Sequence, residues 1–199
     1  MTAKRILIIS AHTSSTSSNS FGKALSERYA AAALTAGHEV KEIFLDQLQF
    51  DPILHEAYHD IQELEPDLVM AQQAILWAEH ICFVYPIWWG SVPALLKGFV
   101  DRVFLPGFAF KYHPGREYPE GLLAGRSAQL IVTMDTPPWF FRWIYQAPGI
   151  RQMQVNTLEL CGIKSVKVMS LGTVIHSNEK QRQSWLERVR ALPAKLNSR

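Results

Sequence analysis

Residues 81–85 read ICFVY, a continuous apolar run that ends at Pro86. A strand that is apolar at every position is typical of a parallel sheet whose two faces are both covered by helices. Two similar runs, RILIIS at residues 5–10 and AQLIVT at residues 128–133, lie before and after it in the sequence. The sequence therefore predicts three buried central strands.

Two further strands carry charges. Residues 38–45 (HEVKEIFL) and 165–171 (SVKVMSL) mix β-branched residues with lysine or glutamate. Charged side chains protect the exposed edges of a sheet, so we expect these two strands at its edges.

Helical spacing of apolar residues separates the strands, at residues 21–36, 66–78, 91–103 and 185–196. We expect Gly37 to end the first helix and Ser91 to cap the third. Alternating strands and helices predict a doubly wound α/β fold with a five-stranded parallel sheet, helices on both faces and right-handed crossovers. With the charged strands at the edges, the strand order is 2-1-3-4-5. This is the flavodoxin-like order, which places a ligand crevice between the first and third strands.

Composition narrows the class of protein. The 199 residues are 48% hydrophobic and 19% charged, which predicts a single globular domain over residues 1–199 rather than a disordered chain. A net charge of +2 does not suggest binding to nucleic acid or to a membrane surface. No apolar run approaches the ~18 residues of a membrane span. Cys82 and Cys161 lack metal-ligand spacing, and such isolated cysteines suit a reducing, cytoplasmic location.

The first loop, residues 11–20, reads AHTSSTSSNS and leads into a helix. The amides and the positive dipole end of a helix N-terminus bind anions, and hydroxyl groups add donors for phosphate oxygens. A solvated loop with an ordinary N-cap is the alternative, but its position at the crevice favours a phosphate site.

The turn after the third strand reads PIWWG, residues 86–90. Backbone amides at such a place can donate to the polar atoms of a flat heterocycle while an indole covers one of its faces. Two tryptophans packed under neighbouring loops, or in an oligomer interface, are the alternative. Long loops are expected at residues 105–123 and 135–149, and long loops in small domains are usually functional.

These segments resemble the NAD(P)H:quinone oxidoreductase (DT-diaphorase) family. The resemblance is dense over residues 83–112, which include GFAFKY at 107–112. It extends to His12 with Ser18 and Asn19 in the first loop, to LCGI at residues 160–163, and more weakly over nearly the whole chain.

The resemblance implies a flavoenzyme that moves two electrons from NAD(P)H through flavin N5 to a quinone-like acceptor. It favours FAD, although the first loop is equally consistent with FMN. It also implies a homodimer with shared active sites, in which Tyr112 lines the acceptor pocket, supplied to the partner subunit's site. The cofactor-binding residues it implies are His12, Thr16, Ser18 and Asn19 at the phosphate end, Pro86, Ile87, Trp88, Trp89 and Gly90 at the isoalloxazine edge, and Thr133, Met134, Asp135 and Thr136 at the pyrimidine side.

The chain departs from the best-known members after the fourth strand. It reads TMDTPPW at residues 133–139 where they have Thr-Thr-Gly-Gly, which changes the freedom of the backbone beside the flavin. Phe141 and Ala147 stand where a tyrosine and a histidine handle charge during hydride transfer, and Tyr145 is the candidate to serve from a shifted turn. Phe110 replaces a usual tyrosine.

The sequence also admits three other interpretations. Residues 55–59 (HEAYH) satisfy the zinc-protease pattern, but in the connection after an edge strand the context is wrong, so no metal is expected. Some relatives of this fold are flavin-binding regulatory subunits of a potassium-efflux system. Fast turnover by the isolated dimer would argue against such a regulatory role for this chain. A one-electron flavodoxin carrier is disfavoured by the positive net charge.

Overall fold

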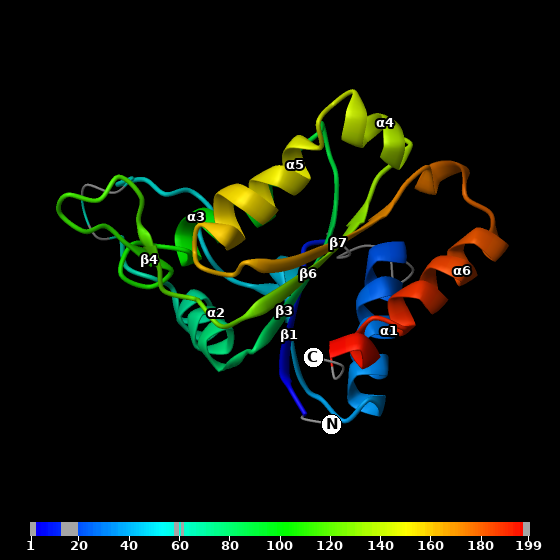
Figure 1. Cartoon of the computed structure of the whole chain (residues 1–199), viewed down its shortest axis with the longest axis horizontal. Helices are drawn as coiled ribbons and strands as arrows, with labels where there is room; N and C mark the ends of the chain where they lie inside the picture. Colours follow the sequence, from blue (N-terminus) through cyan, green and yellow to red (C-terminus); the bar gives the residue numbers. More distant parts are fainter. Residues whose placement is uncertain (1–2, 13–19, 58–59, 61, 197–199) are drawn as a thin grey trace.

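The computed structural model describes residues 3–12, 20–57, 60 and 62–196. Its main sheet has five parallel strands in the order β2-β1-β3-β6-β7, which confirms the predicted order (Figure 1). The strands are β1 (Arg5–Ser10), β2 (Glu39–Phe44), β3 (His80–Pro86), β6 (Ser127–Thr133) and β7 (Ser165–Leu171).

Burial of the strands follows their composition. In β1, β3 and β6 nearly every side chain is buried, whereas β2 and β7 at the edges have mostly exposed or half-buried side chains. The prediction of buried central strands and charged edge strands is therefore confirmed.

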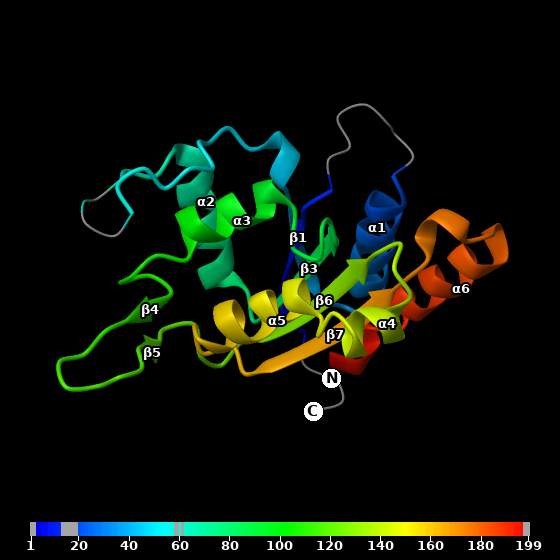
Figure 2. The same cartoon turned by 90° about the horizontal axis from the view of Figure 1, so that it is seen from above.

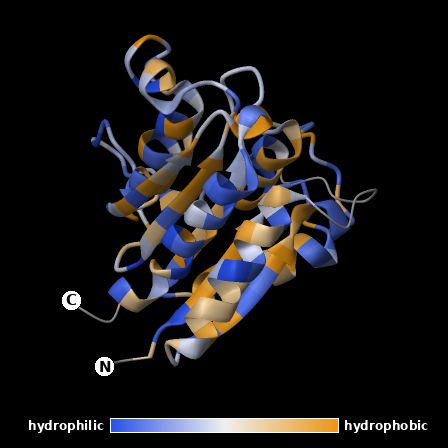
Figure 3. Cartoon of the chain, turned by 90° about the vertical axis from the view of Figure 1, so that its right-hand side faces the viewer, coloured by the Kyte–Doolittle hydropathy of each residue, from blue (hydrophilic) through white to orange (hydrophobic). Residues whose placement is uncertain are grey.

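Helices cover both faces of the sheet. Figure 1 shows α1 (Phe21–Thr35) and α6 (Glu179–Arg190) on one side, and α2 (Pro66–Trp77), α3 (Ala94–Val103) and α5 (Pro148–Arg151) on the other. The helix α5 continues into the π-helical segment η2 (Gln152–Glu159). Each side has its own hydrophobic core against the sheet. In Figure 3, which faces the α1 and α6 side, hydrophobic and hydrophilic residues share these helices, as expected when one helix face is buried.

Two predicted helix boundaries were wrong. Ser91 does not cap α3, which begins at Ala94 after Pro93; its hydroxyl instead donates to Gln152 Oε1 at 3.1 Å. The closing helix α6 ends at Arg190 and is followed by the 3₁₀ turn η4 (Pro193–Leu196). Two shorter 3₁₀ turns are η1 (Leu45–Gln47) and η3 (Val174–His176).

The two segments predicted as loops contain short elements. Residues 105–123 include the strands β4 (Phe110–Lys111) and β5 (Glu120–Gly121), which pair in an antiparallel ribbon. Figures 1 and 2 both show this ribbon projecting away from the main sheet. Residues 135–149 include α4 (Pro138–Trp143) and the start of α5. Among the described helices, none is long and apolar enough to cross a membrane.

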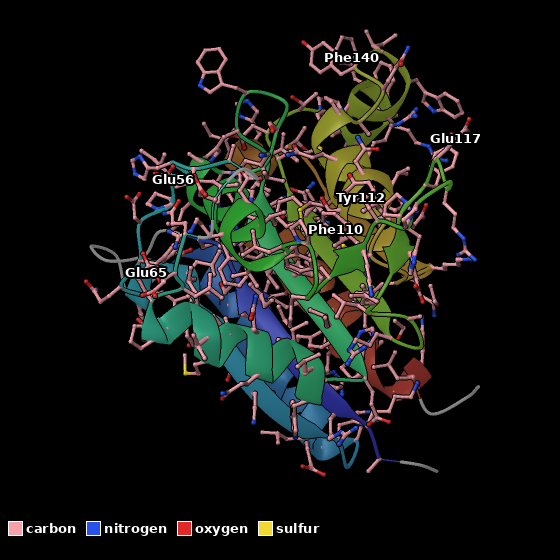
Figure 4. The ribbon with its side chains drawn as sticks, turned by 90° about the vertical axis from the view of Figure 1, so that its left-hand side faces the viewer. Glu56, Glu65, Phe110, Tyr112, Glu117 and Phe140 are labelled. Atoms are coloured by element: carbon pink, nitrogen blue, oxygen red, sulfur yellow. The ribbon has the colours of Figure 1, made fainter. Side chains whose placement is uncertain are left out.

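A buried arginine fixes the long connection between β2 and α2. The side chain of Arg102, on α3, is 1% exposed and forms an ion pair with the half-buried Glu65, Nη2 to Oε2 at 2.9 Å. Arg102 also donates to the carbonyl oxygens of Asp51 and Glu63, the latter at 2.9 Å. Glu65 stands at the start of α2 in Figure 4, so one guanidinium joins two helices and the segment before α2.

We expect Arg102→Met to lower the free energy of unfolding by about 3 kcal/mol, because it leaves the Glu65 carboxylate and two carbonyls without their donor. Urea unfolding followed by circular dichroism measures this loss. Lys97→Met, which removes the exposed ion pair of Lys97 with Asp101 on the same helix, is the matched control and should cost less than about 1 kcal/mol. Equal losses in the two variants would contradict the assignment of Arg102 as the central group.

Candidate functional site

Two adjoining cavities lie where β1, β3 and β6 end. One of about 340 Å³ and one of about 460 Å³ share Ile87, Met134 and Asp135 in their walls. Of the predicted cofactor-binding residues, the first cavity is also lined by His12, Pro86, Trp88 and Thr133, and the second by Trp89, Gly90 and Thr136. Every predicted residue of this group that the structure describes therefore lines one of the two cavities. Thr16, Ser18 and Asn19 lie outside the described residues.

His12 stands at the carboxyl end of β1 and presses against the start of α1. A Cβ on Gly22 would lie 2.0 Å from the His12 ring, so only glycine permits this contact. The ring nitrogen Nε2 is buried and has no hydrogen-bond partner among the described residues. Burial lowers the pKa of His12 to about 4, which the nearby Asp46 carboxylate only partly opposes. The imidazole is therefore neutral at physiological pH.

The N-terminus of α1 opens onto the same cavity, through Ser20, Phe21 and Gly22. This 15-residue helix presents amide donors and the positive end of its dipole there. A neutral histidine ring and a helix N-terminus are together suited to a phosphate group.

The turn after β3 is a two-residue hairpin. Trp88 and Ser91 exchange two backbone hydrogen bonds of 3.0 Å, and between them Trp89 (φ 52°) and Gly90 (φ 79°) are both left-handed. The Trp89 side chain is fully exposed at the rim of the larger cavity. Among the described residues none accepts a hydrogen bond from the Trp89 or Gly90 amides. Two unused donors beside an exposed indole suit the edge of a planar, polar ring.

The segment before η2 holds this hairpin in place. Gly149 donates its amide to Gly90 O at 2.9 Å, and a Cβ on Gly149 would lie 2.9 Å from the Ser91 backbone. With the hydrogen bond from Ser91 to Gln152, these contacts fix the hairpin against a segment about sixty residues later in the chain.

The exit of β6 forms the wall common to both cavities. Thr133 O accepts from Ile87 N at 2.7 Å, which ties the β6 exit to the β3 turn. The Asp135 carboxylate accepts from the Ile175 amide at 2.8 Å. The segment that differs from the Thr-Thr-Gly-Gly run is thus ordered by its own hydrogen bonds and places a carboxylate in the cavity wall.

Aromatic rings from α4 and the following turn close the larger cavity. Tyr145 and Phe141 both line it, with ring centroids 6.4 Å apart in an edge-to-face arrangement. Phe141 is buried and Tyr145 is 53% exposed, so the phenol reaches both the cavity and solvent. Trp139 and Trp143 lie on the exposed side of α4.

Tyr112 lines neither of these cavities. It follows β4 on the projecting ribbon, is 64% exposed, and packs edge-to-face on Phe110 with centroids 5.6 Å apart. Figure 4 shows Phe110 and Tyr112 on the ribbon, with Phe140 of α4 at the top of the molecule. His113 Nε2 lies 2.6 Å from the Glu120 carboxylate across the same ribbon.

The zinc-protease pattern gains no support from the residues that the structure describes. His55 Nε2 is 2.8 Å from the Asp51 carboxylate, and His59 lies outside the described residues. Within the described ranges, no three histidine, cysteine, aspartate or glutamate side chains gather as they would around a metal ion.

The sequence did not identify the residues that hold the site in place through packing and hydrogen bonds. Gly149 and Gln152 position the hairpin, and both are distant from it in the sequence. Gly22 positions His12, which lies only ten residues before it. Phe21, Gly22 and Val174 also line the smaller cavity without having been named as site residues, whereas Ser20 belongs to the loop that was predicted to bind phosphate. A glycine in the first turn of a helix was the one available signal.

Known proteins resemble this chain over most of its length. A family described as having a flavodoxin-like fold matches residues 4–192. An uncharacterized NAD(P)H oxidoreductase of Haemophilus influenzae is 31% identical over 185 residues, covering 91% of this chain and 90% of that protein. The Mus musculus ribosyldihydronicotinamide dehydrogenase [quinone] is 33% identical over 151 residues, covering 69% of this chain and 62% of that protein. This chain thus spans less than two thirds of the length of the mouse relative.

Among solved structures, Smu.1420 from Streptococcus mutans UA159 superimposes with a TM-score of 0.81 at 28% identity, covering 96% of this chain and 99% of that chain.

We expect nitrogen-detected NMR to find the His12 ring neutral at pH 6, with a titration midpoint at pH about 4. An unfolded histidine titrates near 6.5, so between these values the unfolded chain binds more protons and the free energy of unfolding falls as pH falls from 6.5 to about 4. His12→Gln, which cannot titrate, should make this acid loss shallower. A charged His12 at pH 6 would contradict the buried placement.

Proposed function

Because this chain belongs to the flavodoxin-like family that includes NAD(P)H oxidoreductases and quinone dehydrogenases, we propose that it is a flavin-dependent NAD(P)H:quinone oxidoreductase. The observation that carries the proposal is the continuous wall of Ile87, Met134 and Asp135, which joins a phosphate-type cavity to a cavity rimmed by an exposed indole. We further propose that the enzyme is cytoplasmic and works as a homodimer, with FAD as cofactor and FMN as the alternative.

The residues present fit a flavin. The hairpin amides of Trp89 and Gly90 would bind the polar edge of the ring, and the β6 exit, residues 133–136, would contact its pyrimidine side. At the other end the α1 N-terminus and His12 would bind phosphate, together with Thr16, Ser18 and Asn19. The unpartnered Nε2 of His12 supports this placement, because a buried polar atom normally has a partner.

Flavin chemistry supplies two-electron transfer from NAD(P)H to a quinone, in two successive half-reactions of a ping-pong scheme. The chain's own contribution would be to bind and orient both substrates between the hairpin and the aromatic rings of Phe141 and Tyr145. Tyr145 is positioned to hold and move a proton at its phenolic oxygen, since it lines the cavity and also reaches solvent.

Tyr112 would complete the acceptor pocket of the partner subunit. Its exposure on the projecting ribbon supports this role, as does its absence from the walls of the two cavities at the candidate site. Fast turnover by the isolated dimer would separate this proposal from a regulatory subunit of an ion-efflux system.

We expect the purified protein, incubated with FAD or FMN, to show the two visible absorption bands of a bound flavin. Anaerobic NADPH or NADH should bleach the bands, and a small quinone should restore them. Mass spectrometry of the released cofactor decides between FAD and FMN. A protein that stays colourless in excess of both flavins would overturn the proposal.

For the proton path, Tyr145→Phe should lower the rate of quinone reduction about 100-fold, because it removes the phenolic proton donor. Flavin binding should be unchanged, since the ring of the side chain is kept. Tyr118→Phe is the matched control, because Tyr118 is 81% exposed and lines neither cavity. Stopped-flow absorbance measures both half-reactions. Equal rates in the two variants would remove Tyr145 from the mechanism.

A further inference from the structure

A third cavity lies at the opposite end of the parallel strands, where the strands begin. It measures about 270 Å³, and its polar lining residues include Lys4, His80, Arg126, Ser127, Lys167 and Lys195. Figure 1 shows the last described turn, η4, lying beside α1 on the side of the chain's N-terminus. Since β3 runs from His80 to Pro86, its whole length separates this cavity from the candidate flavin site.

A buried histidine, His80, is among the residues that line this cavity. His80 is 2% exposed, and its Nδ1 lies 2.8 Å from Ser127 Oγ. Its Nε2 is buried and has no partner among the described residues. When the Ser127 hydroxyl donates to Nδ1, the neutral ring carries its proton on Nε2, which is then an N–H donor without a partner among the described residues.

A second cavity adjoins this one and is also lined by a residue with a polar atom that is unpaired within the described part of the chain. It measures about 340 Å³, shares Lys167 and Lys195 with the first, and is also lined by Tyr29 and Gln129. Tyr29 is fully buried, and its hydroxyl likewise has no partner among the described residues. Two residues that line adjoining cavities thus each carry a buried polar atom without a described partner, and such atoms are costly when left unpaired.

The charges around the first cavity are mainly positive. Its carboxylate, Glu79, is already paired with Arg5 at 3.4 Å, and Arg126 donates to the carbonyl oxygens at the end of α2. Lys4 and Lys167 form no ion pair with any carboxylate of the described residues. Burial first, and then the charges of Lys4 and Lys167 together with His38, lower the pKa of His80 to about 3.

Hydrogen bonds to a second histidine, His38, hold two of the segments that line this cavity together. The Lys4 amide donates to His38 Nδ1 at 3.1 Å, which leaves the proton of the neutral ring on Nε2 for Pro193 O at 3.2 Å. His38 is buried, and it thereby ties η4, with Lys195, to the segment that carries Lys4. Lysines from three separate elements converge on the cavity as a result.

We propose that this pocket is a second ligand site, which binds a small oxyanion of the phosphate or carboxylate type between Lys4, Lys167 and the Nε2 of His80. It is independent of the flavin site and of the proposed enzyme activity.

The test is a titration of the whole protein with inorganic phosphate and, separately, with malonate, followed through the His80 ring nitrogens by NMR. Because the signal belongs to His80, anion binding beside His12 does not interfere. We expect a saturable shift of Nε2 with at least one of the two anions, and the tighter anion identifies the head group of the ligand.

Lys167→Gln should weaken the binding about tenfold, the effect of losing one charge-assisted contact. Lys180→Gln, on α6 and away from the pocket, is the matched control and should bind like the unaltered protein. Shifts that do not saturate, or that sodium chloride reproduces, would overturn the proposal. So would unchanged binding by Lys167→Gln in a protein whose circular dichroism is unaltered.

Discussion

The parallel pairing of β1 with β3 is the interaction on which the rest of the structure depends. It joins Ile6 to His80 at one end and Ser10 to Val84 at the other. The chain leaves β1 into α1 on one face of the sheet and leaves β3 into α3 on the other. The two connections must therefore diverge, and side chains from both surround the space between them. The place of the candidate flavin site follows from this divergence.

Much of this arrangement could be predicted from short stretches of sequence. The continuous apolar runs at residues 6–9 and 81–85 identify central strands, because a strand that is covered on both faces is typically apolar at successive positions. Once the charged strands are placed at the edges, the crevice follows from topology. The turn at residues 86–90 could then be assigned to the site from its position alone, since it directly follows a central strand.

What could not be predicted depends on contacts between distant segments. Ser91 has the character of a helix cap, but Gln152 and the close approach of Gly149 draw it into a hairpin. The two expected loops contain a ribbon and short helices that are too brief to show a period in the sequence. The burial of His12 depends on the absence of a side chain at Gly22. The spacing of residues in the sequence does not reveal this contact.

The left-handed conformation of Trp89 has a consequence for recognition. An L-residue at a φ of 52° costs about 1 to 2 kcal/mol, and the Trp88–Ser91 hydrogen bonds and Gly149 hold it there. This conformational free energy is part of the folding of the chain and not of the binding of a planar ligand. The hairpin is therefore preorganised: docking a ring demands little loss of backbone entropy, and affinity depends on the fit of the ring rather than on ordering of the loop.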